Sequence, residues 1–245
     1  MYTIRSLIRM LILESTGTKG YKMIFLAGLP GGGKSTLLKQ LGIEDKFTNC
    51  NIDNFFEPLL DSELGTRDLN TITTNFLKWH SLRKGKLEKG EELSPEEIAE
   101  YEKAAHLNST QAKLFARAIK SFTSQLDEVC TIGSNFIIDG TAGSYEKTVK
   151  SVEKYRAAGY DCAMVFVDID VETSVARNLE RGNRGGRALH PSIIRRSNEK
   201  MVENLELYEE FFGENFFLVS NRGTFEDYQA AIEAIRPGIE AFMNS

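Results

Sequence analysis

Short apolar runs and longer amphipathic stretches alternate along the chain after residue 20. Apolar runs without polar alternation are typical of strands that are buried on both faces of a parallel sheet. Such runs lie at 23–27, 135–138, 162–167 and 216–219, and a further, short strand candidate lies at 47–52. The stretches between them carry apolar residues at helical spacing. This alternation predicts an α/β fold with a five-stranded parallel sheet flanked by helices, and ligands at the carboxyl ends of the strands.

Glycines mark the places where predicted helices end. The apolar stripe in residues 171–179 stops before Gly182, so we expect that helix to end there. The apolar residues in 194–212 keep one stripe as far as Gly213, which predicts a single long helix.

A polar and largely helical interval, residues 57–126, interrupts the alternation after the second predicted strand. Within it, Ser94 is a candidate N-cap, Pro95 suits the first helical position and Glu97 completes a capping box. An insertion at this point would overhang the phosphate site, so we expect it to bind the acceptor substrate. A solvated helical excursion without a function is the alternative.

Residues 1–20 are predicted to be an amphipathic leader helix and a linker, ahead of a main domain at 21–245. Apolar residues in 2–14 follow helical spacing, and Arg9 interrupts the apolar core that a secretory signal would need. The leader either packs against the main domain or is removed or bound by a partner. It also resembles the leader peptides of phage head proteins.

The sequence between the first strand and its helix fits Gly-x4-Gly-Lys-Ser, the pattern of a Walker A phosphate-binding loop. Glycines at its two ends let the backbone curl round a polyphosphate, and the following helix adds its positive end. Lys34 is expected to reach the β and γ phosphates, and Ser35 to bind Mg²⁺. The motif therefore predicts that a nucleoside triphosphate binds through Gly28, Gly31, Gly32, Gly33, Lys34, Ser35 and Thr36.

Two aspartates follow predicted strands. Asp53 is placed to accept a proton from an attacking hydroxyl group, which phosphoryl transfer to an alcohol requires. Its alternative role is to cap the following helix. Asp139 follows Phe-Ile-Ile in the form of a Walker B carboxylate, and we expect it to orient the Mg²⁺ ligands or the acceptor. A turn at Asp-Gly-Thr is the alternative there.

Arginines and glycines are interspersed in residues 177–196. Guanidinium groups match phosphate oxygens in pairs, and glycines are poor helix formers that suit a mobile segment. We therefore expect residues 181–191 to be an arginine-rich lid that closes over the triphosphate and excludes water. A solvated helix face would explain Arg195 and Arg196 equally well.

Bulk properties agree with an ordinary globular protein. The chain has 245 residues, 41% hydrophobic residues and a net charge of −5, so nothing global demands a nucleic-acid or membrane partner. Three cysteines without metal-type spacing indicate reduced thiols in a cytoplasmic protein. No apolar run is long enough to cross a bilayer.

Several motifs, in order and spacing, resemble the zeta-toxin family of P-loop kinases over about residues 22–221. They are Gly-Leu-Pro-Gly-Gly-Gly-Lys-Ser-Thr at 28–36, Asn-Ile-Asp-Asn-Phe at 51–55, Phe-Ile-Ile-Asp-Gly-Thr at 136–141, Ala-Ala-Gly-Tyr at 157–160 and Gly-Gly-Arg-Ala-Leu-His-Pro at 185–191. The resemblance implies a P-loop NTPase/kinase fold that uses ATP and Mg²⁺ to phosphorylate a sugar hydroxyl of UDP-N-acetylglucosamine.

Carried over motif by motif, the resemblance implies that Asp53 is the base and that Asp139 and Thr141 face the acceptor. Arg181 and Arg187 become the lid arginines, with Arg177 as the alternative to Arg181. The family often has a second acidic residue near the base, where this chain has Asn51, Asn54 and Phe55. Arg184 and Asn221 are expected to contact the nucleotide.

The leading hypothesis is a kinase with a small nucleotide-sugar-like acceptor. A polynucleotide 5′-hydroxyl kinase, or a kinase of hydroxymethylated bases in phage DNA, is the rival. For the rival stands a basic cluster beside Trp79 and His80, namely Lys78, Arg83, Lys84, Lys86 and Lys89. Glutamates in the same stretch of sequence argue against it, because a charge run is usually solvated surface; they are Glu88, Glu91, Glu92, Glu96 and Glu97. The third hypothesis is a nucleotide-dependent ATPase switch without an acceptor. The sequence assigns no protein partner.

Overall fold

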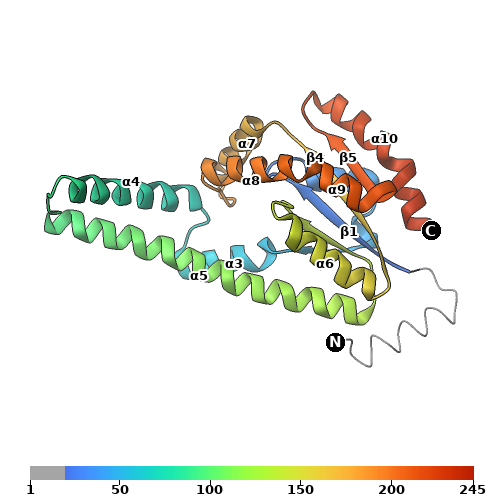
Figure 1. Ribbon diagram of the computed structural model, residues 1–245, viewed down its shortest axis with the longest axis horizontal. Helices are drawn as coiled ribbons and strands as arrows, with labels where there is room; N and C mark the ends of the chain where they lie inside the picture. The colour runs from blue at the N-terminus through green and yellow to red at the C-terminus, as the bar shows by residue number, and fades with distance from the viewer. Residues whose placement is uncertain (1–19) are drawn as a thin grey trace. The chain divides into compact units, whose positions relative to one another are not determined.

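The computed structural model describes residues 20–245, and its centre is a sheet in the order β2-β3-β1-β4-β5 (Figure 1). All four strand pairs are parallel, which confirms the predicted five-stranded parallel sheet. The strands are β1 (Tyr21–Gly28), β2 (Thr48–Asn51), β3 (Phe136–Gly140), β4 (Tyr160–Asp168) and β5 (Phe216–Ser220). The leader helix predicted for residues 2–14 lies outside the described residues.

The chain divides into two compact units. The sheet unit holds the described residues up to Asn51, with Ser124–Ser174 and Arg195–Ser245. The hairpin unit holds Ile52–Thr123 and Val175–Ile194. The hairpin unit therefore combines most of the predicted insertion with the whole of the predicted lid, although the two are far apart in the sequence.

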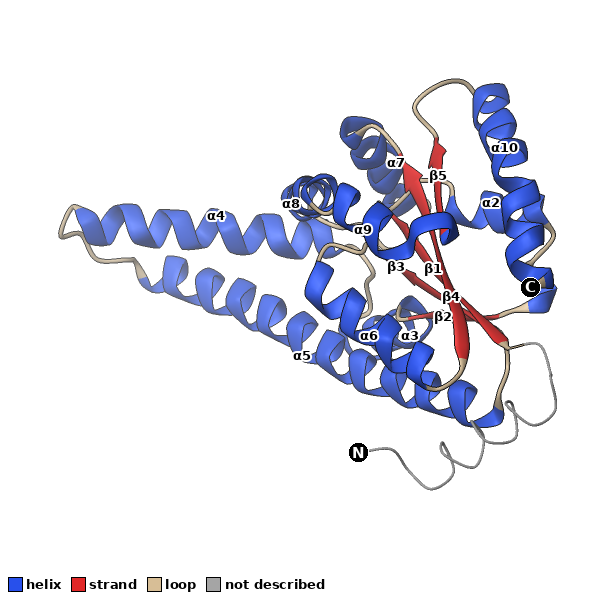
Figure 2. Ribbon diagram, turned by 45° about the vertical axis from the view of Figure 1, so that its right-hand side comes forward, coloured by secondary structure: helices blue, strands red, loops and turns tan. Residues whose placement is uncertain are grey.

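In the sheet unit, alternate strand residues face two layers of helices (Figure 2). Ile24, Leu26 and their neighbours pack against α2 (Lys34–Leu41) and α10 (Phe225–Asn244). The other face meets α6 (Tyr145–Ala157) and α9 (Leu205–Phe212), and the Phe136 ring lies 5.0 Å from that of Tyr155. This burial on both faces explains the continuous apolar runs of the central strands β1, β3 and β4.

The hairpin unit is built from α3 (Asp53–Leu64), α4 (Leu69–Glu88) and the first part of α5 (Pro95–Ile132), with α4 antiparallel to α5 (Figure 1). An ion pair of 2.6 Å between Lys86 and Glu97 joins the helices near their connecting turn. The predicted capping box is confirmed, because Glu97 N–H donates to Ser94 Oγ at 3.2 Å and Ser94 N–H donates to Glu97 Oε2 at 2.7 Å. The core of the hairpin unit comprises Phe56, Leu60, Leu69, Ile72, Leu114 and Ala118.

Two predicted helix boundaries are wrong. Helix α7 (Val171–Asn183) runs through Gly182 instead of ending before it. A Cβ at Gly182 would lie 2.5 Å from Cβ of Ala188, so the glycine permits close packing and does not end the helix. The single helix predicted for 194–212 is two helices, α8 (Pro191–Glu203) and α9, with a turn at Asn204. Asparagine is a poor helix former, and the apolar stripe continues across the turn.

None of the helices in residues 20–245 combines the length and the apolar character that a bilayer crossing requires.

The core of the hairpin unit gives a test of its packing. Leu114 on α5 is 1% exposed, whereas Ile119 on the same helix is 44% exposed. Leu114→Ala should lower the free energy of unfolding by about 2–5 kcal/mol, because it removes buried methyl groups and leaves a cavity. Ile119→Ala, the matched control, should change it by less than about 0.5 kcal/mol. Urea unfolding followed by circular dichroism measures both, and equal losses would contradict this packing.

Candidate functional site

The glycine-rich loop between β1 and α2 is held from behind by two side chains of the sheet unit. Nδ2 of Asn221 donates to the carbonyl of Gly32 at 2.8 Å, and the Tyr228 hydroxyl donates to that of Gly33 at 3.0 Å. Gly33 has a φ of +92°, and a Cβ there would lie 2.8 Å from that Nδ2 and 3.0 Å from that hydroxyl. The curl of the loop therefore requires glycine at this position.

Lys34 lies against the loop and beside the aspartate at the end of β3. Its Nζ donates to the carbonyls of Gly28 at 2.9 Å and Leu29 at 3.2 Å, and lies 3.6 Å from Oδ1 of Asp139. The other carboxylate oxygen of Asp139 accepts a hydrogen bond of 3.0 Å from Asn51. Both charged side chains are about 85% buried. This lysine and carboxylate have the arrangement that Walker A and Walker B residues need to share a phosphate and its metal ion.

The remaining predicted nucleotide and acceptor residues of the sheet unit lie on α2 and directly after β3 and β5. Ser35 is exposed in the first turn of α2, Thr36 is half-buried beside it, and Thr141 is half-buried directly after β3. Asn221, predicted to contact the nucleotide, is buried with its amide bonded to the loop backbone. Arg222 forms two hydrogen bonds with Asp168, at 2.5 and 2.8 Å.

In the hairpin unit, Asp53 is the first residue of α3 and pairs with Arg187. Oδ2 of Asp53 lies 2.6 Å from Nη2 of Arg187, and the two side chains are 23% and 12% exposed. The alternative role of Asp53 as helix cap is wrong, because Ile52 occupies the N-cap position. The sequence positions predicted as the base and as a lid arginine are therefore in direct contact.

Arg181 on α7 supports the same pair. Its Nε donates to the carbonyl of Arg187 at 2.9 Å. Burial lowers the pKa of Arg181, and the neighbouring charge of Arg187 lowers it further. Nη2 of Arg181 and Nε of Arg187 are buried without a hydrogen-bond partner among the described residues. Two guanidinium groups whose N–H donors are not all used can bind an anion.

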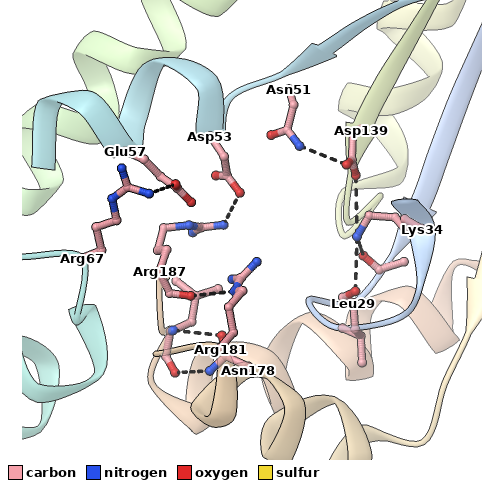
Figure 3. A network of polar contacts seen from close by, with 12 residues as sticks. Leu29, Lys34, Asn51, Asp53, Glu57, Arg67, Asp139, Asn178, Arg181 and Arg187 are labelled. Atoms are coloured by element: carbon pink, nitrogen blue, oxygen red, sulfur yellow. Dashed lines mark hydrogen bonds and ion pairs between the residues drawn. The ribbon is translucent and has the colours of Figure 1, made fainter. Parts of the chain in front are cut away.

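The sequence analysis missed a second carboxylate in this cluster. Glu57 lies one helical turn after Asp53 and forms an ion pair with Arg67 (Figure 3). Arg67 also forms hydrogen bonds of 2.8 and 2.5 Å with Asp61. The bond to Asp61 raises the pKa of Arg67 above its usual range. The signal was available, because aspartate or glutamate at 53, 57 and 61 recurs every four residues and therefore shares one helix face.

The segment predicted as a lid is tied into the hairpin unit. The backbone N–H of Ala188 donates to the carbonyl of Arg67 at 3.2 Å, and the backbone N–H of Asn70 donates to the carbonyl of Ala188 at 2.9 Å. A Cβ at Gly186 would lie 2.7 Å from Cγ of Arg181, so close packing accounts for this glycine. Arg184 is exposed and pairs with Glu180.

Comparison with known proteins places the chain among kinases. A family model described as Zeta toxin matches residues 95–233, which is more than half of the chain. No curated protein matches it. A protein from Chloroflexus aurantiacus that is provisionally named a kinase has a TM-score of 0.54 and 16% identity, over 91% of this chain and 99% of that chain.

Two further structures are similar at lower scores. One is from the PezAT toxin–antitoxin system of Streptococcus pneumoniae, with a TM-score of 0.49, 15% identity and coverage of 100% of this chain and 98% of that chain. The other is from the Pnkp1/Rnl/Hen1 RNA repair complex, with a TM-score of 0.45, 18% identity and coverage of 80% and 48%.

The loop geometry predicts a specific effect of Gly33→Ala. The added Cβ meets Asn221 and Tyr228 and the residue must keep a positive φ, so we expect the Kd for ATP to rise about 100-fold, equivalent to about 3 kcal/mol. Gly42→Ala is the matched control, because its φ is +66° but nothing lies within 4 Å of the added atom. It should cost about 1 kcal/mol of stability and leave the Kd unchanged. Titration with a fluorescent ATP analogue tests both, and equal losses of affinity would refute the steric argument.

Proposed function

Since this chain belongs to the zeta toxin family and is a P-loop kinase, we propose that it transfers the γ-phosphate of ATP to a hydroxyl of a small nucleotide-sugar-like acceptor. UDP-N-acetylglucosamine is the acceptor that the family resemblance suggests. The observation that carries the proposal is the contact between Asp53 and Arg187, since it joins a carboxylate that can accept a proton to a cation that can bind a phosphate.

Nucleotide binding is assigned to the loop of the sheet unit. The ammonium of Lys34 would exchange its carbonyl contacts for the β and γ phosphate oxygens, while the loop amides bind the other oxygens. The Ser35 hydroxyl and the Asp139 carboxylate are hard oxygen donors of the kind that Mg²⁺ prefers, and they would hold it. When bound, Mg²⁺ neutralises charge that develops on the phosphate oxygens.

The transfer step is assigned to the hairpin unit. Asp53 accepts the proton of the acceptor hydroxyl while the oxygen of that hydroxyl forms a bond to the γ-phosphorus. The bond from that phosphorus to the β–γ bridging oxygen breaks, which releases ADP. Arg181 and Arg187 offer guanidinium donors to the transferred group. Asp139 and Thr141 are proposed to contact the acceptor, and Arg184 and Asn221 the nucleotide side.

The charges on the helical hairpin favour a small acceptor over a polynucleotide. Lys86 pairs with Glu97 at 2.6 Å, Lys84 lies 3.8 Å from Glu88, and Arg83 donates to the Tyr101 hydroxyl at 2.9 Å. Cations that are already paired have less charge to offer a phosphate backbone. Two of the five cations of the basic cluster, Lys84 and Lys86, are therefore paired with carboxylates within the hairpin unit.

The base assignment predicts the behaviour of Asp53→Asn. The amide cannot accept the hydroxyl proton, so kcat should fall about 10²- to 10⁴-fold while the Kd for ATP stays the same. Lys34→Ala should instead abolish ATP binding. The measurement is transfer of radiolabelled phosphate, with ATP binding measured separately.

Asp45→Asn is the control, since Asp45 is an exposed carboxylate in the short 3₁₀ helix Glu44–Lys46, an element that holds none of the residues assigned to the reaction. It should leave kcat unchanged. If Asp53→Asn transfers phosphate as fast as the wild type while Lys34→Ala is inactive, another residue is the base.

The acceptor class is tested by labelling a panel with radioactive ATP. The panel contains nucleotide sugars, 5′-hydroxyl oligonucleotides and DNA with hydroxymethyluracil, and we expect label in a nucleotide sugar. Acceptor affinity should depend little on salt. For a groove that binds single strands, the logarithm of the binding constant would fall with the logarithm of the salt concentration, with a slope of about −0.7 per phosphate contact. Label in an oligonucleotide with a steep slope would assign the polynucleotide reaction. Hydrolysis of ATP without any labelled acceptor would indicate a switch.

A further inference from the structure

One fully buried side chain of the hairpin unit has no part in the reaction proposed above. Asn178 on α7 is 0% exposed, and its amide makes two hydrogen bonds with the backbone of Leu189. Nδ2 donates to the carbonyl at 2.8 Å, and Oδ1 accepts from the N–H at 3.0 Å (Figure 3). The Asn178 side chain thus binds both the N–H and the carbonyl of Leu189, as the backbone of a neighbouring strand would.

This pairing fixes the register of the segment that carries Arg187. The segment between Asn183 and Pro191 is neither helix nor strand, so its backbone groups need other partners when they are buried. An amide offers one donor and one acceptor in a plane, and here both go to residue 189. A slip of the segment by one residue would break both bonds at once.

Further contacts fix the segment on the other side and at Arg187 itself. Ala188 is 3% exposed and forms a parallel bridge with Asp68 in the connection between α3 and α4. The carbonyl of Arg187 accepts from Nε of Arg181 at 2.9 Å. Arg187 therefore reaches Asp53 from a backbone that is bonded at three consecutive residues, 187, 188 and 189. At Leu189 both backbone bonds are made by the side chain of Asn178.

We propose that Asn178 is a positioning residue that sets the place of the Arg187 guanidinium against Asp53 by clamping Leu189. The inference rests on the proposed function, because it takes that ion pair as part of the transfer machinery. It predicts that Asn178 affects the rate of transfer through Arg187 and leaves ATP binding to the loop unaffected.

The test begins with Asn178→Ala in the full-length protein. We expect kcat for phosphate transfer to fall about 10- to 100-fold, because a displacement of about 1 Å can cost that much, while KM for ATP changes less than threefold. The amide of Leu189 should exchange its hydrogen faster, which reports the loss of the clamp whether or not the protein is a kinase.

A double-mutant cycle separates positioning from a general structural role. In an Arg187→Gln background, Asn178→Ala should lower kcat less than about twofold, since the residue it acts through is already gone. If the two effects multiply instead, Asn178 does not act through Arg187 and the proposal is wrong. Unchanged kcat in the single variant would overturn it as well.

Gly182→Ala provides a second route if Asn178→Ala does not fold. Alanine favours the helix, but its Cβ would lie 2.5 Å from that of Ala188 and would push the segment away. It should lower kcat in the same way, and an unchanged kcat would argue against the proposal. Asn183→Ala is the control, because it raises helix propensity at an exposed position of α7 and should leave kcat unchanged. A wild-type protein that transfers no phosphate would reject the proposed function. An active wild type whose kcat is unchanged by Asn178→Ala would reject only this inference.

Discussion

A cation that is withdrawn from water needs oxygen atoms around it, and both polar clusters of this chain are organised by that requirement. Lys34 is surrounded by loop carbonyls and the carboxylate of Asp139. Arg187 is held by the carboxylate of Asp53. Each cation is thereby held in a fixed place, which is the condition under which it can bind a phosphate without first being reorganised. The cost is that each must exchange or share a partner when an anion arrives.

The two clusters meet this requirement with different structural means. In the sheet unit the oxygens come from a strand end and a tight loop, so their positions follow from the parallel sheet and from Gly33. In the hairpin unit they come from one face of α3, and the arginines come from α7 and the segment after it. The first arrangement is local in sequence, whereas the second joins residues more than a hundred positions apart.

This difference explains what could be predicted from the sequence. The central strands β1, β3 and β4 were readable because burial on both faces leaves apolar runs, and the loop was readable because its chemistry is contiguous. The capping box before α5 was readable for the same reason. The turn at Asn204 was not, because the apolar stripe passes through it unchanged. Gly182 was misread because nothing local reveals that Ala188 packs against it.

The cluster around Asp53 shows how far such reasoning reaches. Motif resemblance proposed Asp53, Arg181 and Arg187, and these three lie in one cluster, yet the other residues of the cluster were not predicted. Glu57 and Arg67 could have been suspected from helical spacing, since a face with repeated carboxylates needs cations. Asn178 gave no signal at all, because a buried amide that serves a distant backbone has no sequence pattern of its own. Residues that do chemistry are recognisable by type, whereas those that position them are set by the tertiary fold.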